Sequence, residues 1–66
     1  MQHSKARPQF KPGDVLLHPR SEAFYEIIKV VPGRGIYHLK KMMPHAHTVV
    51  RRIPETDGHF DLVREG

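Results

Sequence analysis

The 66-residue sequence predicts an all-β fold, a small barrel of five strands. Three observations favour this prediction. Short runs rich in β-branched and aromatic residues recur about every 8–12 residues, proline and glycine separate these runs, and no window shows the apolar period of 3.6 residues that marks an amphipathic helix. A two-sheet sandwich needs about seven strands, more than this length offers. We therefore expect five strands and no helix.

The first two strands are defined by the residues that end them. Pro12-Gly13 forms a turn, and the first strand is expected at about residues 14–18. Pro19 ends this strand because proline has no N–H for a sheet ladder. The second strand, 24–31, is the longest. Both of its faces are mostly apolar, which is typical of a bent strand that serves both halves of a small barrel.

The other three strands are expected at 36–40, 48–53 and 59–63. A glycine-bearing hairpin turn at 32–35 precedes the third strand, and a polar turn at 54–58 separates the fourth strand from the fifth. Alternation along the fifth strand predicts that Phe60 and Leu62 face the core.

The first nine residues differ from the rest of the chain. Residues 1–9 have no apolar periodicity and include basic side chains, so we expect a flexible basic arm ahead of a single domain at 10–66. The sequence has no cysteine, which excludes disulfides and thiolate metal sites. Its apolar stretches are far shorter than the roughly 18 residues of a membrane span, and no signal-peptide pattern follows Met1. We expect a cytoplasmic protein without a membrane partner.

Two segments resemble those of a known group of folds. The opening Phe10-Lys11-Pro12-Gly13-Asp14-Val15 and the later Gly35-Ile36-Tyr37-His38-Leu39 are similar to segments of SH3-like small barrels. Such openings recur in small bacterial and phage barrel proteins, in KOW-type modules of transcription and translation factors, and in the C-terminal barrels of integrases. The resemblance covers most of 10–63 and implies a five-stranded SH3-like small barrel with a flexible basic N-terminal arm. It leaves function open.

Catalytic groups are scarce. There is no cysteine, and Ser4 and Ser21 lie in the arm and in a loop without a Gly-x-Ser-x-Gly context. One SH3-like enzyme family, the plasmid-encoded dihydrofolate reductases, builds a shared pore from four barrels with a Val-Gln-Ile-Tyr segment. The nearest segment here, Val49-Val50-Arg51-Arg52, lacks the Gln and the Tyr. We expect a monomer that is not an enzyme.

Charge is distributed unevenly along the chain. The 11 Lys and Arg and 7 Asp and Glu give a formal net charge of +4. Residues 38–53 carry four basic side chains and no acid, whereas 54–66 carry one basic and four acidic side chains. The four basic residues, which form one doublet on each of the third and fourth strands, are Lys40, Lys41, Arg51 and Arg52. A hairpin makes these strands neighbours, so at least one member of each doublet points outward.

The doublets predict a basic patch for the phosphate backbone of a nucleic acid. His38 lies within the patch, Tyr37 is the ring best placed to stack on a base, and the arm side chains Lys5, Arg7 and Lys11 extend the positive surface. The predicted function is a non-catalytic module that binds nucleic acid or a nucleoprotein complex, as in transcription regulation. Solvation of a hairpin is the alternative role of the same charges.

A second function is also consistent with the sequence. Paired methionines in a loop suit an adaptable protein interface, and here the candidates are Met42, Met43 and Ile36. The chain would then be a small regulator, such as a phage-type or bacterial modulator docking on RNA polymerase or another enzyme, without direct contact to nucleic acid.

Six histidines raise the question of a metal. His38, His45 and His47 would form a site if they converged across the hairpin, and the sequence leaves that convergence open. His45-Ala46-His47 lies at a turn with no Cys, Asp or Glu nearby in sequence to complete a shell. We expect neither a metal nor another cofactor.

Overall fold

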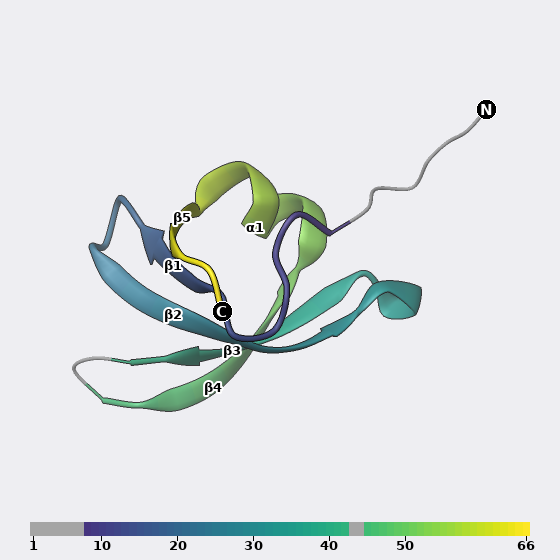
Figure 1. Ribbon diagram of the computed structural model, residues 1–66, viewed down its shortest axis with the longest axis horizontal. Coiled ribbons are helices and arrows are strands. Elements are labelled where there is room, and N and C mark those ends of the chain that lie inside the picture. The colour runs from purple at the N-terminus through teal and green to yellow at the C-terminus, as the bar shows by residue number, and fades with distance from the viewer. Residues whose placement is uncertain (1–7, 43–44) are drawn as a thin grey trace.

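A computed structural model describes residues 8–42 and 45–66, and it confirms the all-β prediction. One antiparallel sheet holds five strands in the order β4-β3-β2-β1-β5. The strands are β1 (Val15–His18), β2 (Ala23–Val31), β3 (Ile36–Lys41), β4 (His47–Arg52) and β5 (Asp61–Arg64). A 3-10 turn, η1 (Pro32–Arg34), joins β2 to β3, and a helix, α1 (Ile53–His59), joins the two edge strands β4 and β5 (Figure 1).

The helix corrects our expectation of no helix and of a polar turn at 54–58. Pro54 lies in the first turn of α1, where its missing N–H has no helical partner to lose. The Thr56 hydroxyl donates to the Arg52 carbonyl oxygen at 2.8 Å, and Ile53 and Thr56 are buried one turn apart. A helix of seven residues is too short to be stable alone, so α1 depends on this packing.

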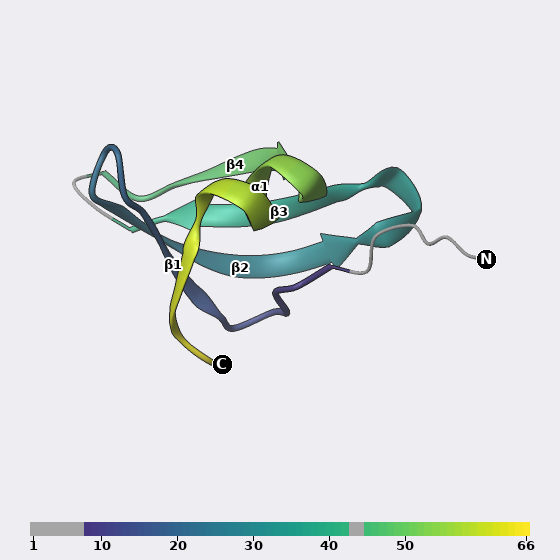
Figure 2. The same ribbon diagram turned by 90° about the horizontal axis from the view of Figure 1, so that it is seen from above.

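The core lies on one face of the sheet, called here the inner face. Leu16, Tyr25, Ile27, Tyr37 and Leu39 project from the three central strands, and Phe10, Ile53 and Phe60 cover them. Both views show α1 over this face (Figures 1 and 2). Phe60 is buried as expected, but the expectation for Leu62 is wrong, because Leu62 is 44% exposed. β5 is an edge strand, and all four of its residues are exposed.

A β-bulge explains why both faces of the second strand are apolar. Ile27 pairs with Leu39, but the next paired residue of β2 is Lys29, opposite His38, so Ile28 has no partner on β3. The extra residue breaks the alternation and bends the strand. Ile28 is therefore exposed although it belongs to an apolar run, and Lys29 shares the face of His38, opposite the core.

A buried carboxylate fixes the turn before β1. Asp14 accepts hydrogen bonds from the Lys11 backbone N–H at 3.0 Å, the Lys11 ammonium at 3.1 Å and the Gly66 backbone N–H at 2.9 Å. Burial raises the pKa of the Asp14 carboxyl, but the hydrogen bonds from Gly66 and Lys11 outweigh burial and leave the pKa below its ordinary value. Gly13 precedes it at φ 95°, a conformation that favours glycine.

A second buried polar contact joins three segments. The Tyr37 hydroxyl donates to Asp57 Oδ1 at 2.6 Å and accepts from the Phe10 backbone N–H at 3.2 Å. The Gln9 backbone N–H donates to Asp57 Oδ2 at 3.3 Å. Burial, followed by the bond to Asp57, raises the pKa of Tyr37 far above its ordinary value, so the hydroxyl keeps its proton. This contact ties the segment before β1 to β3 and α1.

Candidate nucleic-acid interface

The face opposite the core, the outer face, carries a group of basic side chains on three adjacent strands. Lys29 on β2 pairs with His38 on β3, which in turn pairs with Val50 on β4. Lys40 lies two residues from His38 on β3, and Arg52 lies two residues from Val50 on β4, so both share the face of this row. We define the outer basic surface as Lys29, His38, Lys40 and Arg52.

The spacing of this surface follows from sheet geometry. Lys40 pairs with Thr48 and Arg52 with Ile36, so the two charges lie four residues apart along the hairpin, about 13 Å at the usual rise per residue. Lys29, Lys40 and Arg52 are all exposed. The acidic residue Glu26 lies opposite Lys40 in the register of β2 and β3. Within residues 8–42 and 45–66, the ion pairs are those of Lys11 with Asp14 and with Glu65. The basic side chains of the outer surface are therefore available to an external anion.

Each basic doublet is divided between the two faces. Lys40 and Arg52 lie on the outer face, whereas Lys41 pairs with Tyr25 and Arg51 pairs with Tyr37 on the inner face. Lys41 and Arg51 are accordingly only partly exposed. Thus the structure brings Lys40, Arg52 and His38 together and leaves Lys41 and Arg51 out of that group.

The remaining predicted contacts have different outcomes. The expectation of an exposed, stacking Tyr37 is wrong, because its ring is fully buried and its hydroxyl is bonded to Asp57. Lys11 is held by Asp14 rather than extended toward the hairpin. Lys5 and Arg7 lie outside the described residues, as do residues 1–7 of the predicted arm.

Lys29 is the member of the outer basic surface that the sequence did not identify. Strict alternation groups Lys29 with Tyr25 and Ile27, which face the core. The bulge at Ile28 moves Lys29 to the opposite face. The apolar character of both faces of this strand was the available signal, since a bulge is one way to place two successive exposed residues in such a run.

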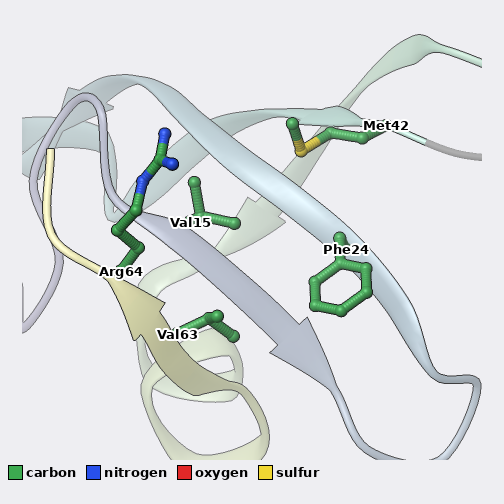
Figure 3. Close-up of a pocket in the computed structure, with 5 residues that line it drawn as sticks. All are labelled: Val15, Phe24, Met42, Val63 and Arg64. Carbon is green, nitrogen blue, oxygen red and sulfur yellow. The ribbon is translucent and has the colours of Figure 1, made fainter.

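An apolar hollow adjoins the basic surface on the outer face. It has a volume of about 250 Å³ and is lined by Val15, Phe24, Met42, Val63 and Arg64 (Figure 3). Met42, one of the predicted protein-binding residues, lies here and is 38% exposed. Ile36 lies at the opposite end of β3, so the structure does not bring it to Met42. Met43 is outside the described residues.

The histidines of the hairpin do not share a face. His38 is on the outer face, whereas His47 pairs with Lys41, whose alternation places it on the inner face. His47 Nδ1 donates to the His45 carbonyl oxygen at 2.9 Å. Among the described residues, no three His, Cys, Asp or Glu side chains are grouped closely enough to hold a metal ion.

Comparison with protein-family models, curated proteins and solved structures gives no match to this chain. The SH3-like resemblance of the opening segments therefore stays a prediction. In the part of the chain that the structure describes, no helix has the length and apolar character needed to cross a bilayer.

Proposed function

We propose that this chain is a non-catalytic binding module that engages nucleic acid, alone or within a nucleoprotein complex, through the outer basic surface. The observation that carries the proposal is the convergence of Lys29, Lys40 and Arg52 from three strands onto one face, around His38. The proposed setting is the cytoplasm, with transcription regulation as one process that such a module serves. The proposed fold context is the SH3-like small barrel that the opening segments resemble.

Phosphates are the favoured contact. Tyr37, the ring predicted to stack on a base, is buried in the core, as are Tyr25 and Phe60. Binding of this kind depends on salt, because each neutralised phosphate releases counterions. Three phosphate contacts give a slope of log K against log salt of about −2.7 for duplex DNA and about −2 for a single strand.

The test is removal of charge from the outer face. The double variant Lys40→Gln/Arg52→Gln is expected to weaken binding of a short duplex with 5′-hydroxyl ends and to reduce the salt slope by about two contacts, because each lost cation leaves one phosphate unneutralised. The matched control, Arg20→Gln/Lys41→Gln, removes the same charge from a loop and from the other face of β3. Fluorescence anisotropy at several salt concentrations measures both, and circular dichroism checks folding.

Two results would contradict the proposal. One is undiminished affinity of the outer-face variant. The other is an equal loss in the outer-face variant and in the control, which would mean that net charge alone governs binding.

A second candidate function is supported by the apolar hollow. Val15, Phe24, Met42 and Val63 form an exposed apolar concavity beside Arg64, as a docking site for a protein side chain requires (Figure 3). In this alternative the chain is a protein-binding regulator without direct nucleic-acid contact. An amide-shift titration with the duplex distinguishes the two. Shifts centred on residues 29, 38, 40 and 52 favour nucleic acid, and the absence of shifts at low salt favours the regulator.

A further inference from the structure

A second cavity lies at one end of the inner face, where β1, β4 and α1 meet. Its volume is about 250 Å³, and it is lined by His18, Arg20, Arg51, Glu55, His59 and Phe60. A neighbouring cavity of about 280 Å³ shares His18, Arg20 and His59 with it and adds Asp61. Two arginines and two histidines thus converge from β1, the turn after it, β4 and α1, at a place distinct from the outer basic surface.

Arg51 is held in this cavity by aromatic rings. Its guanidinium carbon lies 5.5 Å from the ring centroid of Phe60 and 5.9 Å from that of Tyr25, distances at which the rings attract and orient a planar cation. Arg51 Nε is buried and has no hydrogen-bond acceptor among the described residues. A buried donor of this kind usually has a partner. The arginine is therefore fixed in place with unused hydrogen-bonding capacity.

Both histidines have one ring nitrogen committed to the backbone. The Ser21 backbone N–H donates to His18 Nδ1 at 3.3 Å, so the neutral His18 ring carries its proton on Nε2. The Glu55 carbonyl oxygen accepts from His59 Nδ1 at 2.8 Å, so Nε2 is the free nitrogen of His59. The His18 ring also meets the Phe60 ring edge to face, at 4.8 Å between centroids. These contacts fix both rings and leave Nε2 of each uncommitted among the described residues.

The acids of the site form no direct ion pair with its arginines among the described residues. Glu55 lines the cavity that contains Arg51, and Asp61 lines the neighbouring cavity. Neither acid forms an ion pair with Arg20 or Arg51 among the pairs present in residues 8–42 and 45–66. The two arginines donate no hydrogen bond to another described side chain or backbone group. Neither guanidinium is therefore held in a direct ion pair by the acids of the cavities.

We infer that this cavity binds a phosphate monoester through Arg51, Arg20 and His18. Guanidinium groups bind phosphate oxygens in pairs of parallel hydrogen bonds, and the His18 Nε2–H adds a donor. The cavity is smaller than the roughly 300–1,000 Å³ of sites for drug-sized ligands, so it suits a phosphate with a small part of its ester. A free nucleotide and the phosphorylated end of a nucleic acid both present this group.

The first experiment uses inorganic phosphate as the probe. An amide-shift titration at constant ionic strength, balanced with chloride, is expected to give saturable shifts at residues 18–21, 51 and 55–60. Arg51→Gln and Arg20→Gln should each weaken binding about 10- to 100-fold, as expected for loss of a charge-assisted hydrogen bond. Arg20 is exposed, so its variant tests the site even if replacing Arg51 disturbs the packing of Phe60.

Arg34→Gln is the matched control, since it removes an exposed arginine of η1 that belongs neither to the cavity nor to the outer basic surface, and it should leave phosphate affinity unchanged. Shifts that do not saturate, or equal losses in the Arg20, Arg51 and Arg34 variants, would overturn the inference. Because this probe contains no nucleic acid, the result does not depend on whether the outer basic surface binds nucleic acid.

The second experiment assigns the source of the phosphate. A nucleoside 5′-monophosphate is compared with a short oligonucleotide that carries either a 5′-phosphate or a 5′-hydroxyl. Tighter binding of the phosphorylated oligonucleotide, lost in Arg51→Gln, supports a nucleic-acid end. Competition by the mononucleotide, with no preference between the oligonucleotides, supports a free nucleotide. Failure of both ligands to produce shifts at residues 18–21 and 51 would overturn the site.

Discussion

Arg51 and Arg52 are neighbours in β4 and lie on opposite faces of the sheet. Arg51 packs on two aromatic rings at the end of the core and shares a cavity with two histidines, whereas Arg52 is exposed among basic side chains of the outer face. Two identical residues therefore have different partners because a strand turns successive side chains to opposite sides. The comparison shows that a basic doublet in a strand predicts one cation for each face, rather than one patch of two.

The largest expected difference between the faces concerns side chains in the core. Leu39 is fully buried on the inner face, and Val50, on the adjacent strand, is 53% exposed on the outer face. Leu39→Ala should lower the free energy of unfolding by about 2–5 kcal/mol through lost burial and the cavity left behind. Val50→Ala should stay within about 0.5 kcal/mol. Urea denaturation measures both, and equal losses would contradict the assignment of the faces.

The contrast extends to carboxylates. Asp14 is buried with three hydrogen-bond donors, whereas Asp61 is exposed. Asp14→Asn should lower the free energy of unfolding at pH 7 by about 1.5–3 kcal/mol, the range for hydrogen bonds to a charged group. Asp61→Asn, the control, should have little effect.

The same carboxylate predicts a pH dependence. The folded-state pKa of Asp14 is below its ordinary value, so its contribution is complete above the unfolded value of about 3.9 and is lost as pH falls through the folded pKa. The difference in unfolding free energy between the native chain and Asp14→Asn should therefore shrink below about pH 4. A difference that stays constant from pH 7 to pH 2.5 would show that the charge of Asp14 has no part in it.

A smaller effect is expected from a buried hydroxyl. Tyr37→Phe removes the donor to Asp57 and leaves the Phe10 N–H without its acceptor, at a cost of about 1–3 kcal/mol in unfolding free energy. Tyr25→Phe is the matched control, because Tyr25 is equally a core tyrosine but its hydroxyl makes no hydrogen bond to the other described residues. Thermal denaturation of the two variants gives the comparison, and equal melting temperatures would show that the Tyr37 hydroxyl adds nothing.

The smallest expected effect on the free energy of unfolding is that of replacing Arg51 or Arg52. Arg51→Gln loses the contacts of its guanidinium with Phe60 and Tyr25, worth about 0.5–1 kcal/mol in unfolding free energy. Arg52→Gln should stay within about 0.5 kcal/mol. Urea denaturation measures both variants. A larger loss of unfolding free energy in Arg52→Gln than in Arg51→Gln would contradict the assignment of Arg51 to the aromatic contacts.

The strands were predictable because their signals are local. Alternation, β-branched residues and the prolines and glycines between runs locate all five strands to within a few residues of their positions in the structure. The helix was not predictable in the same way. α1 includes Gly58 and only seven residues, and its stability comes from buried contacts of Ile53 and Thr56 that no local pattern displays.

The candidate sites also differ in how far local sequence signals could predict them. Alternation within a hairpin places Lys40, Arg52 and His38 together, which sequence could indicate. Lys29 reaches the same face only because of a bulge in β2. Tyr37 is not available for stacking because its hydroxyl is bonded inside the fold to Asp57, 20 residues away. The phosphate cavity draws His18, Arg51 and His59 from three elements, so only the folded chain brings these residues together.

The contact between Tyr37 and Asp57 has a consequence for local opening of the fold. It is the point where the segment at 8–10, β3 and the helix that ends at His59 are joined by hydrogen bonds. Because proteins open locally in cooperative units, we expect these three segments to open together. The backbone amide protons of Gln9 and Phe10 should therefore exchange with deuterated solvent at a rate set by release of α1, together with the Phe60 amide that bonds to Thr56. Fraying of the chain before β1 and unwinding of the helix after β4, distant in sequence, become a single event.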